Sequence, residues 1–379
     1  MRVVVDISPA VNSKAGLGRY AATLVEHLQH TWVGEHLYLF YNRRFGGSVP
    51  PALSSLPARR VSLGYKPWRM LVWIGHLLNI PFDRLLPADT RLFHATEHLL
   101  LPFRRIPTVF TVHDLIFEKF PQYHKPLNLF YLRHTVPLFV RRATAVITIS
   151  QASKRDLVTR YHVPEEKIHV IYEAPAPHFR PVPPDDVVAV RHKYGLPERY
   201  ILTVGTLEPR KNLVSLLTAF EEVYASGLVD GWVIVGQRGW LYKDFLDALV
   251  QSPLRDRVIM TGFVPDEDLP AIYAGALVFV FPSFYEGFGL PLLEAMAVGV
   301  PVVASSAPPL PEIGGDAALY ASPYRHEEFV AHILAYLQDR TLREEMRERG
   351  WRRARQFSLE RTAAETAALY AQVIAQGTG

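Results

Sequence analysis

Residues 276–304 constrain the fold of this 379-residue chain more than any other stretch. Residues 276–281 form a continuous apolar run, as expected of a strand that is buried on both faces. A short helix is predicted next, because Pro291 suits its first position and Gly299 suits its end. A second buried strand, 300–304, follows at once. This succession of strand, loop, helix and strand predicts an α/β fold with a parallel, doubly wound sheet.

The loop of this unit carries two carboxylates eight positions apart. Glu286 precedes the predicted helix, and Glu294 lies in its first turn. The free N–H groups of residues 287–290 would point to the edge of the sheet where doubly wound folds bind ligands. Backbone donors beside two acceptors suit the hydroxyls and phosphates of a sugar nucleotide. In the simpler alternative, Glu294 only faces the helix dipole, and Gly287 and Gly289 only make the turn.

The composition narrows the class of protein. The chain is long enough for two domains, and its hydrophobic fraction of 49% argues against disorder. The absence of cysteine excludes disulfides, thiol catalysis and cysteine-based zinc sites. Residues 1–7 are too short and too strand-like for a signal peptide, and no apolar run reaches the roughly 18 residues of a spanning helix. We therefore expect a cytoplasmic protein that contacts, at most, the inner face of the cell membrane.

Charge is distributed unevenly along the chain. Residues 1–178 hold 22 Lys and Arg against 12 Asp and Glu, a balance of +10. The remainder holds 41 − 22 = 19 against 37 − 12 = 25, a balance of −6. A basic half suggests that one domain meets an anionic substrate or membrane surface. Nucleic acid is the weaker explanation, because the chain has no arginine-rich arm, RNA-binding signature or zinc finger.

A glycine-containing stretch follows the first predicted strand, 2–8. Residues 12–20 include Gly16 and Gly18, and a helical pattern comes after them. This order predicts a phosphate-binding loop, because glycine lets backbone N–H groups approach an oxyanion closely. It is not the Rossmann fingerprint, since the third glycine is absent, and no Walker lysine follows. A simple tight turn remains the alternative.

Residues 66–87 mix tryptophan, leucine and basic residues. Such a mixture is found on helices that lie in a membrane interface. It is also found on helices that pack against a sheet, which are more common, and we favour that interpretation.

His113 directly follows an apolar run, 108–112, that predicts a strand. A titratable residue just beyond a parallel strand is in the ligand-facing position, so His113 is a candidate to orient a substrate group. A zinc site would need an ordered ligand set. The candidate ligands near His113 do not have the spacing of an ordered zinc site, so we expect no metal. These candidates are His94, Glu97, His98, His124 and His134.

A second series of strands and helices begins after a proline-rich segment, 172–184, which is the predicted interdomain linker. Its first strand, 200–204, is followed by a loop that ends in Arg210 and Lys211, at the start of a predicted helix. Cations at a helix start oppose the helix dipole. Unless these two are simply solvated, an anion beside them resolves the conflict, and a diphosphate fits.

In this order and spacing, the motifs of the chain resemble the retaining glycosyltransferases of family 4, which have the GT-B architecture. The resemblance extends over most of the chain and rests on residues 15–20, 112–115, 148–153, 205–212, 262–264 and 286–294. It implies an α/β fold of two Rossmann-like domains that face a central cleft. We expect an acceptor-binding domain of residues 1–178, completed by a C-terminal helix at 358–379, and a nucleotide-sugar-binding domain of residues 179–357.

The resemblance also implies roles for particular residues. Arg210 and Lys211 would hold the donor diphosphate, Glu286 would face the donor sugar, and Glu294 would accept hydrogen bonds from the ribose. His113 would sit beside the donor sugar. The other residues expected at the donor are Glu208, the backbone of Gly16 and Gly18 at the diphosphate, Phe263 and Val264 at the base, and Gly287, Phe288, Gly289 and Leu290 around the sugar. At residues 172–175 the sequence differs from the hinge of many relatives. This difference affects the expected geometry of the linker and not the expected chemistry.

The chemistry suits these residue types. Loss of a nucleoside diphosphate builds charge on the β-phosphate, which fixed cations and N–H dipoles stabilise, so no metal or other cofactor is expected. Retention in the family is assigned to attack on the same face, so Glu286 is not expected to be the nucleophile that paired carboxylates suggest. Resemblance to bacterial O-antigen and capsule mannosyltransferases favours GDP-mannose over UDP- or ADP-sugars as donor, with a glycan or lipid-linked saccharide as acceptor.

Two other classes stay open, and a third is disfavoured. A sugar-nucleotide epimerase of the same architecture would form product without an acceptor. A catalytically silent binding subunit would not need the intact set of Arg210, Lys211, Glu286 and Glu294. A Rossmann oxidoreductase would need the glycine fingerprint and the ribose-binding acid that this chain lacks.

Overall fold

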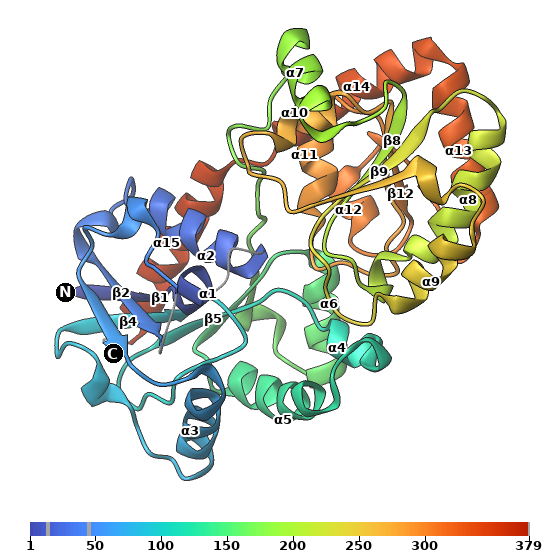
Figure 1. The fold of residues 1–379 in the computed structure, drawn as a ribbon. Helices are drawn as coiled ribbons and strands as arrows, with labels where there is room; N and C mark the ends of the chain where they lie inside the picture. The colour runs from blue at the N-terminus through green and yellow to red at the C-terminus, as the bar shows by residue number, and fades with distance from the viewer. Residues whose placement is uncertain (13–15, 44–46, 378–379) are drawn as a thin grey trace. The chain divides into compact units, whose positions relative to one another are not determined.

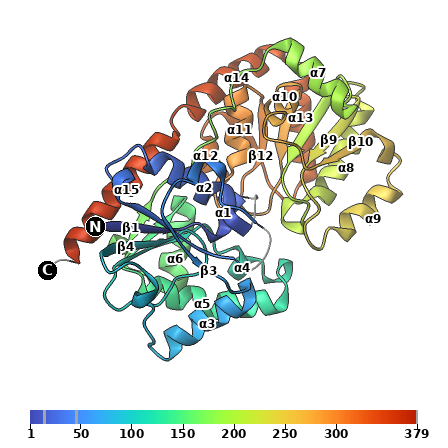
Figure 2. The same ribbon diagram turned by 60° about the vertical axis from the view of Figure 1, so that its left-hand side comes forward.

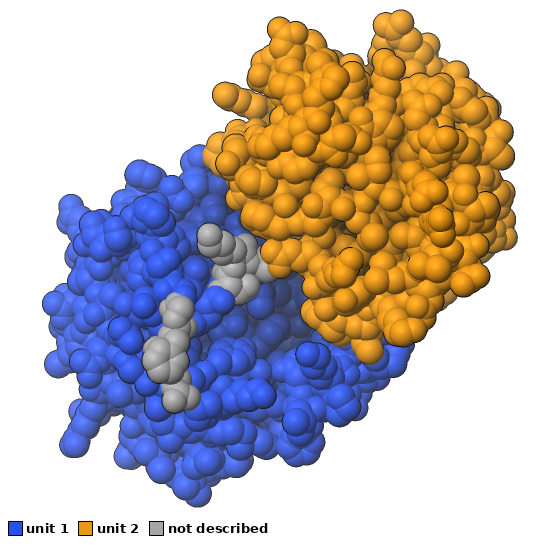
Figure 3. Space-filling view, viewed as in Figure 1, with its two compact units in different colours: residues 1–173, 358–379 blue, residues 174–357 orange. Residues whose placement is uncertain are grey.

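The computed structural model describes residues 1–12, 16–43 and 47–377. Ser13, Lys14 and Ala15, which belong to the predicted glycine loop, and residues 378–379 of the predicted C-terminal helix lie outside this range. The chain divides into two units, coloured separately in Figure 3. Unit 1 consists of residues 1–173 and 358–379, and unit 2 of residues 174–357. No helix in the described part of the chain is both long and apolar enough to cross a membrane.

Unit 1 is built on a parallel sheet of seven strands within the described residues, in the order β3-β2-β1-β4-β5-β6-β7. The strands are β1 Arg2–Asp6, β2 Leu37–Asn42, β3 Ala58–Val61, β4 Thr90–Ala95, β5 Thr108–Val112, β6 Ala145–Thr148 and β7 Ile168–Val170. The central strands are buried on both faces: Val3 and Val5 of β1 join one core, and Val4 joins the other. This is why their sequences are continuous apolar runs.

Helices cover both faces of this sheet (Figures 1 and 2). They are α1 Ser8–Asn12, α2 Gly16–Leu28, α3 Tyr65–Leu77, α4 Ile116–Lys119, α5 Pro126–Arg142, α6 Gln151–Tyr161 and α15 Leu359–Gln376. α2 and α15 supply apolar side chains to one core. α3, α5 and α6 supply them to the other. The segment 66–87 therefore begins as a helix that packs on the sheet through Trp68 and Val72, as we favoured.

The last helix, α15, belongs to unit 1 although it comes after unit 2 in the sequence. It packs beside α2, and its Tyr370 hydroxyl lies 2.5 Å from Nδ1 of His94 on β4. Nε2 of His94 lies 2.7 Å from the Thr111 hydroxyl. Burial lowers the pKa of His94 to about 3, so the ring is neutral and both of its nitrogens are satisfied. His94 is thus a structural residue that fixes α15 to the sheet.

Unit 2 has a parallel sheet of six strands within the described residues, in the order β10-β9-β8-β11-β12-β13. The strands are β8 Tyr200–Val204, β9 Gly231–Val235, β10 Val258–Gly262, β11 Val278–Phe281, β12 Val302–Ser305 and β13 Ala318–Ala321. β11 and β12 are the two strands predicted around the carboxylate loop. The chain is thus α/β with two Rossmann-like domains, as predicted.

The helices of unit 2 are α7 Pro184–Tyr194, α8 Leu213–Ala225, α9 Lys243–Gln251, α10 Leu269–Ala274, α11 Leu290–Val298, α12 Leu310–Gly314, α13 His326–Gln338 and α14 Arg340–Ala354. α8, α9 and α13 contribute to one core with Ile201, Trp232 and Val278 of the sheet. α10 and α11 lie together and α11 packs on α14. The loops that leave the carboxyl ends of β8 and β11 carry most of the predicted site.

Candidate active site

A buried cluster of two cations and a carboxylate lies beyond the carboxyl ends of β8 and β11. Nζ of Lys211 donates to Oε1 of Glu286 at 2.7 Å. Nη1 of Arg210 lies 2.5 Å from Oε2 of the same carboxylate and also donates to the carbonyl oxygen of Tyr285 at 2.9 Å. Nη2 of Arg210 pairs with Oε1 of Glu208. The structure therefore brings together four of the predicted residues, which the sequence separates by up to 78 positions.

Local backbone geometry presents the two cations side by side. Pro209–Lys211 forms a single turn of 3₁₀-helix, and Asn212 follows in the left-handed conformation with φ 56°. The amide of Asn212 donates to the carbonyl oxygens of Pro282 at 3.2 Å and Pro323 at 2.7 Å, which ties this loop to the end of β11. Gly205 has φ +149°, and a Cβ there would lie 3.1 Å from Cε of Lys211. Glycine is the residue that permits both this conformation and this approach.

Glu286 is ionised at neutral pH. Its exposed fraction is 7%, and burial alone would raise its pKa. The charges of Arg210 and Lys211 outweigh burial and hold the pKa of Glu286 at about 2. Glu286 and Glu208 thus contact the two cations at the start of α8, and the expectation that a diphosphate lies beside these cations stays a prediction. Two cations and two carboxylates leave the cluster without a large formal charge.

Glu294 lies on α11 and is 4% exposed. α11 begins at Leu290, one residue before the predicted start, because Gly289 occupies the N-cap position with φ 113°. Glu294 is therefore the fifth residue of the helix, and its predicted place in the first turn is wrong. The Tyr273 hydroxyl donates to its Oε2 at 2.9 Å. A carboxylate interacts favourably with the helix dipole mainly within the first turn. At the fifth position of α11, this interaction explains the presence of Glu294 less well.

The other residues expected at the donor differ in how far their side chains are exposed. Phe288 is 3% exposed and its ring packs on Phe357, so its side chain is held within unit 2. Val264, after β10, is 4% exposed, whereas the ring of the adjacent Phe263 is 57% exposed. Gly287 and Leu290 are half-buried.

In unit 1, His113 follows β5 and is 5% exposed. Its Nε2 lies 3.0 Å from the carbonyl oxygen of Thr96, and its Nδ1 lies 3.4 Å from Oε1 of Glu173. Burial opposes protonation, but the hydrogen bond and charge of Glu173 raise the pKa of His113 above its usual value. The ring of Tyr20 meets it edge-on, with centroids 4.7 Å apart. Both ring nitrogens therefore have partners within unit 1.

Gly16 and Gly18 lie in the first turn of α2 and not in a loop, so the loop prediction is wrong at these positions. The first N–H groups of a helix have no partner within the helix, so the start of α2 has the same kind of donors as the loop prediction relied on.

Three partners of the site escaped sequence reasoning: Glu173 beside His113, Tyr273 beside Glu294, and Phe281, whose ring centroid lies 4.8 Å from Nζ of Lys211. Glu173 and Tyr273 lie 60 and 21 positions from the residues they contact, and no local motif marks them.

Comparison with solved structures gives the fold class of this protein. Two doubly wound parallel domains are the architecture of GT-B glycosyltransferases. The fold matches HepE of Anabaena, crystallised with UDP, with a TM-score of 0.73 and 19% identity over 98% of this chain and 100% of that one. It matches WaaG, a glycosyltransferase involved in lipopolysaccharide biosynthesis, with a TM-score of 0.73 and 18% identity over 97% and 99%.

Sequence similarity then gives the family. Residues 189–353 match the family described as glycosyl transferases group 1, and residues 15–174 match glycosyltransferase family 4. The chain is 34% identical to O-antigen chain mannosyltransferase B of Escherichia coli, over 98% of this chain and 99% of that protein. It is 30% identical to O-antigen chain mannosyltransferase RfbU of Salmonella typhimurium, over 67% of each. The chain belongs to the family 4 glycosyltransferases and is an enzyme of that kind.

Proposed function

We propose that this glycosyltransferase moves mannose from GDP-mannose to a glycan or lipid-linked saccharide, with retention of configuration. The observation that carries the proposal is the buried cluster of Arg210, Lys211 and Glu286, whose chemistry suits a sugar diphosphate. The choice of mannose and of a growing saccharide as acceptor is supported by relatives whose names describe O-antigen mannosyltransferases.

In this proposal the two cations stabilise the leaving group. The bond from the anomeric carbon to the β-phosphate oxygen breaks, and the electron pair stays on the diphosphate beside Arg210 and Lys211. Preorganised charges in a buried site stabilise such developing charge better than water does. The departing phosphate takes the proton of the acceptor hydroxyl as that oxygen bonds to the same face of the sugar.

Glu286 then serves as a fixed acceptor of hydrogen bonds from the sugar hydroxyls. Because its pKa lies at about 2, it is a carboxylate throughout the neutral range and has no proton to give. Each of its oxygens already faces a cation, which lowers its nucleophilicity. Glu294, buried beside Tyr273, is the proposed acceptor for the ribose hydroxyls.

His113 acts in this scheme as a donor and a positive charge. Its Nε2 is engaged by a carbonyl oxygen, which can only accept, and its Nδ1 faces a carboxylate. A general base would need an unprotonated nitrogen directed at the acceptor. We therefore assign His113 to charge stabilisation and positioning.

The proposal includes two further features. The reaction proceeds without a metal, so EDTA leaves the rate unchanged. The protein works in the cytoplasm, with the basic unit 1 in peripheral contact with the anionic inner face of the membrane.

The experiment is a transfer assay with radiolabelled GDP-mannose and a synthetic mannose oligosaccharide. We expect Lys211→Ala and Glu286→Ala each to lower the rate by at least about 100-fold while the protein stays folded. Arg340→Ala is the control, because this side chain is 83% exposed on α14. Near-wild-type turnover in either site variant would overturn the assignment. Incubation with donor alone tests the epimerase alternative, which requires an epimerised sugar nucleotide as product.

A further inference from the structure

The carboxyl edge of the sheet in unit 1 gathers buried polar atoms that have no hydrogen-bond partner among the described residues. They are Oδ2 of Asp6, which ends β1, Oδ1 of Asn42, which ends β2, and Nδ1 of His98, which lies shortly after β4. Buried polar atoms are almost always hydrogen-bonded in folded proteins. Several unpartnered atoms at the edge where doubly wound domains bind ligands therefore indicate a site.

Glu97 is the carboxylate at this edge that a ligand can reach. It lies two residues after β4, its exposed fraction is 7%, and its carboxylate accepts no hydrogen bond from the described residues. Asp6 is fully buried, and its Oδ1 accepts hydrogen bonds from the backbone N–H group and the hydroxyl of Ser8 at 2.8 and 2.5 Å. Glu97 can therefore contact a ligand directly, whereas Asp6 acts on that ligand only through Glu97.

The backbone before Glu97 is held by two neighbouring strands. β1, β4 and β5 are adjacent in the sheet. The hydroxyl of Thr96 donates to the carbonyl oxygen of Asp6 at 2.6 Å, and the carbonyl oxygen of Thr96 lies 3.0 Å from Nε2 of His113. Thr96 thus joins the ends of the three strands. Glu97 has a fixed position and an unused carboxylate, which is what a binding residue requires.

The groups around Glu97 set its charge. Burial and the charge of Asp6 raise the pKa of Glu97 to about 7, against the opposite effect of Arg69 and His113. Glu97 is therefore mainly a carboxylate at pH 8, and a carboxylate accepts hydrogen bonds but donates none. Hydroxyl groups are the ligands that suit it. The titratable and charged groups that interact with Glu97 are Asp6 of β1, Tyr65 and Arg69 of α3, Tyr131 of α5, and His113 after β5.

A metal ion is the other ligand that neighbouring carboxylates attract. Calcium takes six or more oxygen ligands, and zinc takes an ordered set of side chains. In the part of the chain that the structure describes, no three His, Asp or Glu side chains form a group that could hold an ion. The positive charge of Arg69 near Glu97 also disfavours a cation. A polyhydroxyl ligand fits the site better.

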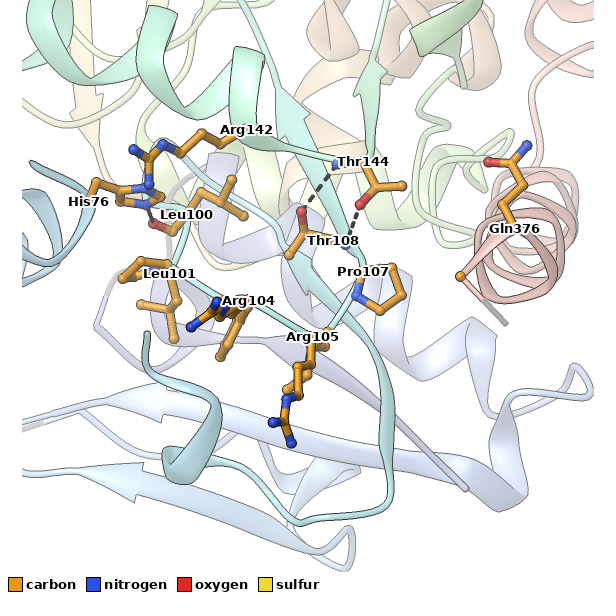
Figure 4. A pocket seen from close by; sticks show the side chains of 14 residues that line it. His76, Leu100, Leu101, Arg104, Arg105, Pro107, Thr108, Arg142, Thr144 and Gln376 are labelled. Carbon is orange, nitrogen blue, oxygen red and sulfur yellow. Dashed lines mark hydrogen bonds between the residues drawn. The ribbon is translucent and has the colours of Figure 1, made fainter. Parts of the chain in front are cut away.

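The position of Glu97 suits the acceptor of the proposed reaction. His113, whose charge acts on Glu97, is the residue that we expect beside the donor sugar, and the acceptor hydroxyl must reach the anomeric carbon of that sugar. A cavity of about 330 Å³ lies at the other end of β5, where Thr108 and Thr144 bond to each other's backbone N–H groups at 3.0 and 3.2 Å (Figure 4). The length of β5, roughly 16 Å, separates this cavity from His113. The reacting sugar cannot lie that far away.

We propose that Glu97 binds hydroxyl groups of the terminal sugar of the acceptor and that this sugar is uncharged. This assignment rests on the sugar transfer proposed above and adds the residue that holds its acceptor. Asp6 is a positioning residue, since its charge controls the ionisation of Glu97. A uronic acid or a sugar phosphate would bring a further negative charge against both carboxylates, and juxtaposed like charges oppose binding. The site therefore selects a neutral saccharide.

The test is saturation-transfer NMR titration of the full-length protein at pH 8, without donor. The probes are the methyl glycosides of mannose, galactose and glucose, and the matching uronic acids. We expect the wild type to bind at least one neutral glycoside and to bind its uronic acid counterpart more weakly. Glu97→Gln should weaken binding of the neutral glycoside by about 10-fold, because a hydrogen bond to a charged acceptor becomes one to a neutral amide.

The pH dependence distinguishes binding by Glu97 from a merely structural role. In the wild type, affinity should rise between pH 6 and pH 8 as Glu97 ionises, and this rise should disappear in Glu97→Gln. Asp6→Asn keeps an oxygen for Ser8 and removes the charge that raises the pKa of Glu97, so the rise should move to lower pH. Glu166→Gln, at an exposed position of unit 1, is the control and should behave as the wild type does.

Thermal denaturation completes the test. Glu97→Gln removes a buried charge without a hydrogen-bond partner, so the melting temperature should stay the same or rise. The proposal is overturned if no neutral glycoside binds, if Glu97→Gln binds as the wild type does, if the uronic acid binds equally well, or if Glu97→Gln lowers the melting temperature. Stabilisation of the wild type by Ca²⁺ or Mg²⁺ that Glu97→Gln abolishes would also overturn it. No nucleotide is present, so failure of the donor assignment leaves these outcomes unchanged.

Discussion

At the scale of single residues, the proposed donor site is governed by the balance of charge around Glu286. Two cations contact this carboxylate, and Glu208 contacts one of them. The cations are thus already partly neutralised before any diphosphate arrives. The charge of Glu286 should therefore weaken the binding of GDP, whereas its carboxylate should favour sugar transfer.

Replacement of Glu286 by Gln should separate the two effects. Loss of one negative charge leaves Arg210 and Lys211 more positive, so GDP should bind about 10-fold more tightly, as expected for a charge several ångströms away. Sugar transfer should fall by at least about 100-fold, because the acceptor of the sugar hydroxyls is altered. Titration calorimetry with GDP and the transfer assay measure the two quantities. Weaker GDP binding in this variant would contradict the charge argument.

The contact between Glu173 and His113 should make stability depend on pH. The pKa of His113 is raised in the folded state, so this contact stabilises fully below pH 6.5 and is lost as pH rises through the folded pKa. Glu173→Gln should therefore lower the melting temperature more at pH 6 than at pH 9. Thermal denaturation at both pH values, with the exposed Glu198→Gln as control, measures this. An equal effect at both pH values would show that the pair is not ionic.

Sequence reasoning succeeded at the residue scale where chemistry is local. Arg210 and Lys211 are adjacent, and Glu286 and Glu294 share one loop and helix, so their motifs could be recognised from the sequence; their roles at a donor stay predictions. It could not predict that Lys211 and Glu286 bond to each other, because such a pairing depends on the order of β8 and β11 in the sheet.

At the scale of elements, burial explains which strands were predictable. Strands inside each sheet, such as β1 and β8, are buried on both faces and appear in the sequence as apolar runs. β3, β7 and β13 were missed; all three lie at sheet edges and are partly exposed, so their sequences lack such runs.

The start of α11 depends on Gly289. Its φ of +113° disfavours any residue with a Cβ, and a Cβ there would lie 2.8 Å from Cδ2 of Leu310. Gly289→Ala should therefore cost about 1–3 kcal/mol, a fall of roughly 2–12 °C in melting temperature for a domain of this size. Gly227→Ala is the control, because Gly227 also has a positive φ, +71°, but open space around it. Equal losses of stability in the two variants would show that the contact between the added Cβ and Leu310 contributes nothing.

The attachment of α15 depends on Tyr370. Its hydroxyl is the partner of buried His94, so Tyr370→Phe leaves Nδ1 of that ring without its hydrogen-bond partner. The expected cost is about 1–3 kcal/mol. Chemical denaturation measures it, with Tyr324→Phe at a 74% exposed position as the control. An unchanged free energy of unfolding would mean that α15 is held by its apolar contacts alone.

At the scale of the whole molecule, the two units differ in how the chain builds them. Unit 2 is one continuous segment, 174–357, whereas unit 1 needs α15 from the end of the chain. We expect the isolated segment 174–357 to fold and to bind GDP, because Arg210, Lys211, Glu286 and Glu294 all lie within it. Circular dichroism and calorimetry test this. A segment that folds but does not bind GDP would place essential donor contacts in unit 1.

The central claim is that the cluster at the ends of β8 and β11 holds the diphosphate of a guanine nucleotide sugar. Thermal-shift measurement with GDP, UDP, ADP and their sugars tests it most directly, on the wild type and on Lys211→Ala. We expect GDP and GDP-mannose to raise the melting temperature of the wild type, the other nucleotides to raise it less, and Lys211→Ala to abolish the shift. No stabilisation by any of these nucleotides, or an undiminished shift in Lys211→Ala, would contradict the claim.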